Sequence, residues 1–281
     1  MGTYLILDKS VFEATSTFKL GKFAQNHFLI LPDVLYYECA TTDTNKERLL
    51  DRFRSVILSG AYTCPSYVDI IRNEAKNLYP YGFIVDLEEV PAVRKTFQLN
   101  SRPYSSNHAQ EKLEDELDMA KMLRDSSDDY LKKIAVENPS LLSEIRKFDN
   151  SRKGRFERFR AWAKNVDSQD IHWASMKQLK GVTHCHDKYC LSDEWVSWQF
   201  LRLTHIIFME HAFLRQTGDV SKIESFEHDI QDVKYVLLLS RADGLLTRDT
   251  GCSCLAQAAF PEKDVFTSLD KVPEEYICHW S

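Results

Sequence analysis

The chain has 281 residues, of which 43% are hydrophobic and 28% are charged. This balance is ordinary for a globular protein and excludes a wholly disordered chain. The 42 acidic residues outnumber the 36 basic ones, for a net charge of −6. A uniformly basic nucleic-acid-binding surface is therefore excluded, although a local basic patch is not.

No targeting or membrane segment is recognisable in the sequence. The first residues, MGTYLILDKS, lack the basic start and the long apolar stretch of a signal peptide. No apolar run approaches the roughly 20 residues of a membrane span. The seven cysteines are scattered and odd in number, which favours a reducing compartment. We therefore expect a cytoplasmic protein without membrane partners.

The N-terminal third alternates short apolar runs with helical patterns. Residues 3–7 and 28–31 are short, apolar runs that predict buried strands. A helix is expected to begin near Pro32, and apolar residues at helical spacing predict further helices over 45–58 and 66–78.

The middle of the chain, from about residue 103 to 218, has a helical pattern and contains no run that clearly predicts a strand. The alternation then returns, with predicted helices over 225–241 and 251–259 and predicted strands over 245–247 and 264–267. Strands that alternate with helices favour parallel pairing. We therefore expect an α/β fold with a parallel sheet built from both ends of the chain.

Four acidic residues stand where an α/β fold places chemistry. Asp8 follows the first predicted strand, Glu38 lies on the helix after the second, Asp232 lies in the helix over 225–241, and Asp249 closely follows the strand over 245–247. Ligands of open parallel sheets bind beyond the carboxyl ends of the strands. Carboxylates gathered there repel one another, and Mg²⁺ or Mn²⁺ relieves that repulsion.

These segments resemble the PIN-domain nucleases. The resemblance is carried by LILDKSVF, LPDVLYYECA and DVKYVLLLSRADGLLTRD. It implies a PIN-like three-layer α/β/α core formed by residues 1–98 and 222–281, interrupted by a helical insertion over 99–221. It also implies an active site that binds Mg²⁺ or Mn²⁺ through four catalytic acids, namely Asp8, Glu38, Asp232 and Asp249.

Several nearby residues are candidates for supporting roles. Thr247 occupies the threonine position of the family's T-x-D turn, and Ser10 offers a hydroxyl beside Asp8 where the family commonly has Asn. Asp229 lies one helical turn before Asp232 on the same face, so either residue is a candidate for the third metal-binding acid. Asp243 is a further competing carboxylate.

The activity implied by the resemblance is metal-assisted hydrolysis of phosphodiester bonds by an endoribonuclease, of the kind found in toxins or defence effectors. A regulatory protein partner or a homo-oligomer fits such an enzyme. The alternatives are a DNA-directed flap nuclease and a catalytically inactive PIN-like protein that binds nucleic acid or acts as a scaffold. Each acid taken alone is also explained as a turn residue, a helix cap or a solvated side chain.

A basic segment within residues 144–164 interleaves arginines with aromatic residues. Its candidates for binding nucleic-acid phosphates are Arg152, Lys153, Arg155, Arg158 and Arg160, and its candidates for stacking on bases are Phe156, Phe159 and Trp162. The alternative is an amphipathic helix whose aromatic side chains pack inward. The acidic segment over 111–129 is a candidate for masking the basic one.

Two groups of residues contain cysteines at spacings close enough to raise the question of a metal site. His184, Cys185, His186 and Cys190 form a zinc-like cluster, but their spacing is not that of a standard zinc site, so we expect a polar loop. Cys252 and Cys254 are expected to be small helix residues, because Mg²⁺ does not favour thiolates.

Overall fold

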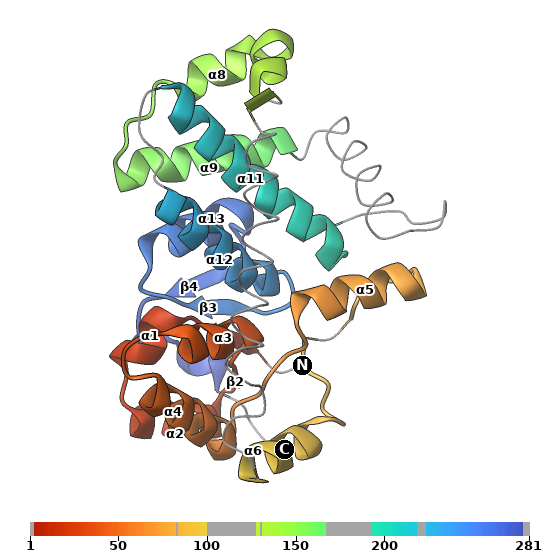
Figure 1. The fold of residues 1–281 in the computed structure, drawn as a ribbon, viewed down its shortest axis with the longest axis vertical. Coiled ribbons are helices and arrows are strands. Elements are labelled where there is room, and N and C mark those ends of the chain that lie inside the picture. Colours follow the sequence, from red (N-terminus) through yellow and green to blue (C-terminus); the bar gives the residue numbers. More distant parts are fainter. Residues whose placement is uncertain are drawn as a thin grey trace.

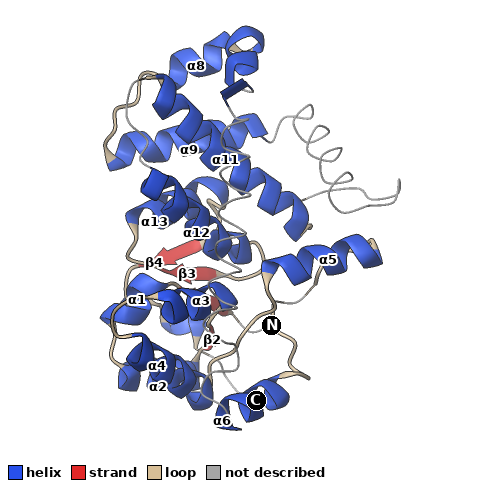
Figure 2. Cartoon of the chain, in the orientation of Figure 1, coloured by secondary structure: helices blue, strands red, loops and turns tan. Residues whose placement is uncertain are grey.

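The computed structural model describes residues 3–82, 84–99, 128–129, 131–166, 193–217 and 223–277. Within these ranges the protein is an α/β structure in which helices cover both faces of a four-stranded parallel sheet (Figure 1). Figure 2 shows the strands in the middle layer with helices on either side. The predicted three-layer α/β/α architecture with a parallel sheet is confirmed.

The sheet joins the two ends of the chain, in the spatial order β2-β1-β3-β4. Its strands are β1 (Tyr4–Leu7), β2 (Phe28–Ile30), β3 (Gly244–Leu246) and β4 (Asp264–Phe266). After β1 the chain adds β2 on one side, and it later returns to place β3 on the other side. The carboxyl ends of β1 and β3 therefore form the topological switch point at which open parallel sheets bind ligands.

The strands are apolar runs because helices cover both faces of the sheet. Leu5, Ile6 and Leu7 of β1 have no exposed surface, and Leu245 and Leu246 of β3 are equally buried. Strands buried on both faces read as continuous apolar runs rather than as an alternating pattern. This explains why short, mostly apolar runs of three to five residues located the strands to within one residue.

The N-terminal part contains the three predicted helices, α3 (Asp33–Thr41), α4 (Lys46–Ser59) and α5 (Tyr67–Asn77), and three that were not predicted, α1 (Lys9–Ala14), α2 (Thr17–Asn26) and α6 (Val90–Leu99). Helix α4 packs against both α2 and α3. The C-terminal part supplies α12 (Ile223–Leu239), which contacts β1 and β3, and α13 (Thr250–Ala259), which contacts β4. Short 3-10 turns at Leu269–Lys271 and Glu274–Tyr276 follow β4.

The described part of the predicted insertion is helical. It contains α8 (Pro139–Ile145), α9 (Arg152–Val166) and α11 (Val196–Gln216), and no strand occurs in residues 131–166 or 193–217. Helix α9 packs on α13 and α11, and α11 packs on α12 and α5 (Figure 1). Phe159 of α9 and Leu203 of α11 belong to the same hydrophobic cluster as the strands. These helices therefore extend the core of the α/β layer.

Glu74 of α5 fastens α11 to the N-terminal part of the chain. Its buried carboxylate accepts hydrogen bonds from the backbone N–H groups of Val196 at 2.9 Å and Ser197 at 2.8 Å, in the first turn of α11. It also accepts a 3.0 Å bond from the N–H of Tyr81. A carboxylate at a helix N-terminus satisfies free N–H groups and complements the helix dipole.

None of the helices in the described ranges combines the length and the apolar character needed to cross a bilayer.

Candidate active site

Asp8 and Thr247 face each other at the switch point, at the carboxyl ends of β1 and β3. The backbone N–H of Asp8 bonds to the carbonyl of Leu246 at 3.0 Å, and the side chain of Asp8 accepts bonds from Thr247 Oγ1 at 2.7 Å and Ser10 Oγ at 2.5 Å. Burial raises the pKa of Asp8, and the two hydroxyl donors offset part of that effect. Ser10 and Thr247 therefore orient a buried carboxylate.

Asp249 lies immediately beside this pair and also begins α13. Its backbone N–H donates to Thr247 Oγ1 at 3.0 Å, and its Oδ1 accepts bonds from the N–H groups of Gly251 at 2.6 Å and Cys252 at 3.0 Å. The expected alternative, that Asp249 caps the helix, is confirmed. The two cap bonds use only Oδ1, so Oδ2 keeps its acceptor capacity.

Glu38 approaches the site from α3. Its Oε2 accepts a short hydrogen bond from the hydroxyl of Tyr235 on α12. Burial raises the pKa of Glu38 to about 7, and Asp8 adds to that rise, while the bond from Tyr235 and the charge of Lys9 oppose it. Glu38 thus changes its protonation state near neutral pH.

Asp232 of α12 lies among the other acids, and its pKa is raised as well. Burial raises its pKa well above the usual range, and the negative charges of four other carboxylates raise it further, in the order Asp249, Asp229, Asp8 and Glu38. Within the described ranges no hydrogen-bond donor is recorded for its carboxylate. A Cβ atom at Gly251 would stand 3.2 Å from Asp232 Oδ2 and 3.1 Å from Asp249 Oδ1, so the two side chains approach the same point. The structure therefore brings the four predicted acids together.

Asp229 is held differently from Asp232. Both of its oxygens lie 2.6 Å from Arg155 Nη2, and Oδ2 also lies 2.7 Å from Nε2 of His211. Burial raises the pKa of Asp229, but the bonds and charges of His211 and Arg155 outweigh burial and lower it overall. The sequence did not single out His211 as a site residue, although it is one of the polar residues that interrupt the apolar pattern of α11.

Asp243 lies at the opposite edge of the sheet from the four acids. It precedes β3, and its Oδ2 accepts a 2.7 Å bond from the backbone N–H of Tyr4 at the start of β1. The expectation that Asp243 supports the site is therefore wrong, because this carboxylate caps the amino ends of the strands while the site lies at their carboxyl ends.

The basic segment forms α9, and its side chains divide into exposed and buried ones. Arg152, Lys153 and Arg160 are exposed. Arg158 is buried, with Nη2 2.7 Å from Glu210 of α11, so the prediction of a phosphate contact is wrong for this residue. The pair joins α9 to α11, because a cation that is buried between the helices needs a paired anion.

The aromatic side chains of α9 follow the amphipathic alternative. Phe159 and Trp162 have no exposed surface, and Trp162 Nε1 donates to Glu210 at 3.2 Å. The prediction that these two stack on bases is therefore wrong. Phe156 is partly buried against the core. The acidic segment lies mostly outside the described residues; Asp128, which is described, pairs with Arg215 of α11 at 2.7 Å rather than with α9.

The structure describes the two cysteines of α13 but not the cluster of histidines and cysteines over residues 184–190. Cys252 and Cys254 are buried free thiols within α13, as expected of small helix residues. The cluster formed by His184, Cys185, His186 and Cys190 lies outside the described residues.

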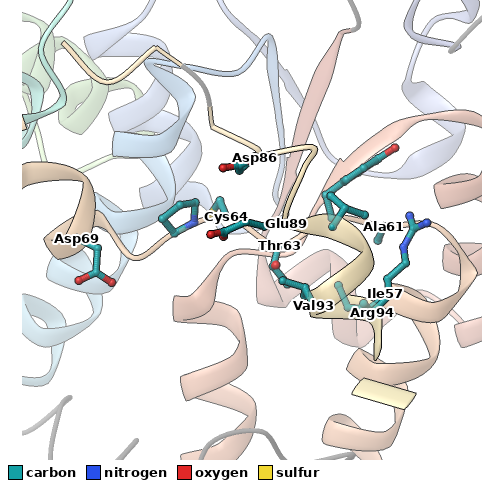
Figure 3. A pocket seen from close by; sticks show the side chains of 12 residues that line it. Ile57, Ala61, Thr63, Cys64, Asp69, Asp86, Glu89, Val93 and Arg94 are labelled. Atoms are coloured by element: carbon teal, nitrogen blue, oxygen red, sulfur yellow. The ribbon is translucent and has the colours of Figure 1, made fainter. Parts of the chain in front are cut away.

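A cavity of about 260 Å³ lies away from the four acids, between the end of α4 and the start of α6 (Figure 3). Its charged lining residues include Asp69, Asp86, Glu89 and Arg94. Arg94 Nη2 donates to the carbonyl of Gly60 at 2.9 Å, and Asp69 accepts a bond from Ser66 at the start of α5. These two side chains thus serve local structure, and none of the residues singled out from the sequence lines this cavity.

The four acids offer donors of the right chemical type for a hard divalent cation, since carboxylate oxygens are the ligands that Mg²⁺ and Mn²⁺ prefer. In the arrangement described, however, no three His, Cys, Asp or Glu side chains of the described residues lie close enough together to hold a metal ion. Asp8 is turned toward Ser10 and Thr247, Asp249 toward its helix cap, and Glu38 toward Tyr235.

Comparison with known proteins adds no relative. No protein-family model, no curated protein and no solved structure matches this chain.

Proposed function

We propose that this chain is a PIN-like, metal-dependent endonuclease that hydrolyses phosphodiester bonds, with RNA favoured over DNA as its substrate. The observation that carries the proposal is the gathering of acids at the switch point, where Thr247 bonds to both Asp8 and Asp249, and Asp232 and Asp249 approach the same Cβ position at Gly251. Carboxylates held together against their mutual repulsion, in the place where parallel sheets bind ligands, are a recognised mark of a functional site. The preference for RNA rests on the family resemblance.

The cation would be Mg²⁺ or Mn²⁺, held by Asp8, Glu38, Asp232 and Asp249. A bound ion of this kind lowers the pKa of a coordinated water and offsets the charge that develops on the phosphate. Because no three such side chains of the described ranges are close enough to hold an ion as they stand, the proposal requires the carboxylates to converge when the cation binds. Metal titration tests that requirement directly.

The other residues of the site orient the acids or contact the nucleic acid. Ser10 and Thr247 hold the Asp8 carboxylate, and the Tyr235 hydroxyl holds Glu38. The exposed cations of α9 would contact phosphates of the nucleic-acid strand that runs past the site. They are Arg152, Lys153 and Arg160. Such contacts position a nucleic acid without reading its sequence.

The test is a cleavage assay on mixed single-stranded RNA and DNA, with Mn²⁺ or with EDTA. Wild type is compared with Asp8→Asn and Asp249→Asn, and with Glu137→Gln as a control at a side chain that is 61% exposed. We expect Mn²⁺-dependent cutting, stronger on RNA, that survives Glu137→Gln and is lost in the two site variants. Site variants that fold and still cut like wild type would contradict the assignment.

A second candidate is a catalytically inactive PIN-like protein that binds nucleic acid or acts as a scaffold. It is favoured by the finding that the described side chains do not form a group of three that could hold a metal. The two candidates differ in the effect of Mn²⁺ on thermal unfolding. A ligand that binds only the folded state stabilises it by about 2.7 kcal/mol at 100 times its Kd. A rise in Tm with Mn²⁺ supports the enzyme, and an unchanged Tm supports the inactive protein.

A further inference from the structure

Arg155 is carried by α9, a helix of the predicted insertion, yet its guanidinium group lies among the acids of the α/β core. Nη2 contacts both oxygens of Asp229 at 2.6 Å, and the guanidinium lies over the ring of Phe159, with 4.9 Å to the ring centroid. Packing of α9 on α13 brings the helix to this position. The guanidinium group is thus fixed by an anion on one edge and by an aromatic ring on its face.

Asp229 is occupied by this anchoring. Arg155 uses both of its oxygens, and His211 contacts Oδ2 from α11. Asp232, one helical turn further along α12, has no donor recorded among the described residues. The geometry therefore points to Asp232 as the third acid of the metal group and to Asp229 as the residue that positions Arg155.

The anchoring leaves donors of Arg155 unused. Within the described ranges only Nη2 makes side-chain hydrogen bonds, so Nε and Nη1 keep their N–H groups. Nη1 lies 3.1 Å from the Cβ position of Gly251, the point that Asp232 Oδ2 and Asp249 Oδ1 also approach. The Arg155 side chain keeps 30% of its surface exposed, and its ion pairs in the described structure end at Asp229. A fixed cation with free donors beside a set of carboxylates is suited to bind an anion.

We propose that Arg155 binds a phosphate oxygen of the nucleic acid at the acidic site, and that Asp229 and His211 are positioning residues for it. The inference rests on the proposed function, because it places the phosphate next to the metal-binding acids. It gives the insertion a defined role, since α9 supplies a cation that lies beside Asp229 and near Asp232 and Asp249. The charge of Arg155 reduces the repulsion between these carboxylates and an incoming phosphodiester.

The first test measures binding without cleavage. A fluorescein-labelled single-stranded RNA of mixed sequence is titrated in EDTA at several salt concentrations, and its anisotropy is recorded for wild type, Arg155→Met, Arg155→Lys and the exposed control Arg146→Met. We expect Arg155→Met to bind about 10-fold more weakly, with a salt slope smaller by about 0.7, the value for one lost phosphate contact on a single strand. Arg155→Lys, which keeps the charge, should recover part of the affinity, and Arg146→Met should match wild type.

The second test separates the two aspartates. Asp229→Asn should lose RNA affinity as Arg155→Met does but keep the rise in Tm that Mn²⁺ produces, whereas Asp232→Asn should lose that rise. If Asp229→Asn does not fold, the double variant Arg155→Gln, Asp229→Asn replaces the ion pair with two neutral hydrogen-bonding side chains and is measured instead. A merely structural role of Asp229 would lower Tm and leave the salt slope unchanged.

The outcomes distinguish this inference from the proposed function. The inference is overturned if Arg155→Met binds RNA with the affinity and the salt slope of wild type. It is also overturned if the only effect of Arg155→Met is tighter binding of Mn²⁺, because Arg155 would then act as a counter-ion of the acids. The opposite result is also possible. If wild type neither binds Mn²⁺ nor cuts RNA, but Arg155→Met lowers its RNA affinity, the proposed function is contradicted and the phosphate contact is supported.

Discussion

The hydroxyl of Thr247 donates a hydrogen bond of 2.7 Å to the carboxylate of Asp8, 239 positions earlier in the chain. The two residues follow neighbouring parallel strands, and the same hydroxyl accepts the N–H of Asp249. One buried hydroxyl therefore links the first and the last acid of the site. It follows that the site forms only when the two ends of the chain have paired as β1 and β3.

Removal of this hydroxyl should destabilise the fold. Thr247→Val keeps the shape of the buried side chain but leaves the Asp8 carboxylate with one donor fewer and the N–H of Asp249 without its acceptor. A hydrogen bond to a charged group contributes about 2 kcal/mol. Urea unfolding should show a loss of that size for Thr247→Val and a smaller one for Thr247→Ser, which keeps the hydroxyl. Equal stability of Thr247→Val and wild type would contradict the role given to this bond.

The elements of the sheet were predictable because their signals are local. The two central strands, β1 and β3, are short runs buried on both faces, and acids that closely follow such runs must lie at one end of a parallel sheet. Asp8 and Asp249 were found on this basis, and the structure places them together. The sequence predicted a parallel sheet built from both ends of the chain but not its strand order, so the pairing of β1 with β3 was learned from the structure.

The pairing of charged side chains was not predictable, because it depends on tertiary contacts. Arg155 and Arg158 are three residues apart on one helix and look alike in the sequence, yet one faces Asp229 and the other is buried against Glu210. The same applies to Asp229 and Asp232, which share a helix face. Only the positions of α9 and α11 decide which acid is neutralised and which is left to repel its neighbours.

The stability of the metal-free protein should fall as pH rises from about 4.5 to about 7. Glu38 has its pKa raised to about 7, mainly by burial, above the usual 4.5. The folded state therefore holds a proton that the unfolded state has already lost in this window, so the contribution is fully present below pH 4.5 and is lost as pH passes 7. Asp8 and Asp232, whose pKa values are also raised, add a dependence of the same sign.

The control for this prediction is Glu38→Gln, which cannot titrate. Urea unfolding in EDTA between pH 5 and 8 should give a shallower decline for Glu38→Gln than for wild type. With Mn²⁺ present the wild-type trend should reverse, because the cation binds the ionised carboxylates. A wild-type profile in EDTA that is flat, or that rises across this window, would disagree with the burial of Glu38.

Asp232→Asn should leave the metal-free protein more stable while abolishing the effect of metal. Asp232 is half-buried, and four neighbouring carboxylates oppose its ionisation, so Asn should raise the free energy of unfolding in EDTA by about 1 kcal/mol at a pH high enough to ionise Asp232, as is common when a functional site is relieved of strain. The Mn²⁺-induced rise in Tm should disappear. Asp129→Asn, at a side chain that is 84% exposed, is the matched control and should keep the response to Mn²⁺.

The attachment of α11 through Glu74 should contribute strongly to stability. Glu74→Ala leaves the N–H groups of Val196, Ser197 and Tyr81 without their acceptor in a buried place. The expected loss in urea unfolding is about 3 kcal/mol, since each buried donor left unsatisfied costs about 1–3 kcal/mol and water can enter to relieve part of it. Glu137→Ala, at an exposed helix position, should change stability by less than about 0.5 kcal/mol.

Since α11 also carries His211 and Glu210, which pair with Asp229 and Arg158 respectively, Glu74→Ala should weaken RNA binding as well. Retained stability together with lost binding would assign Glu74 to the site rather than to the fold.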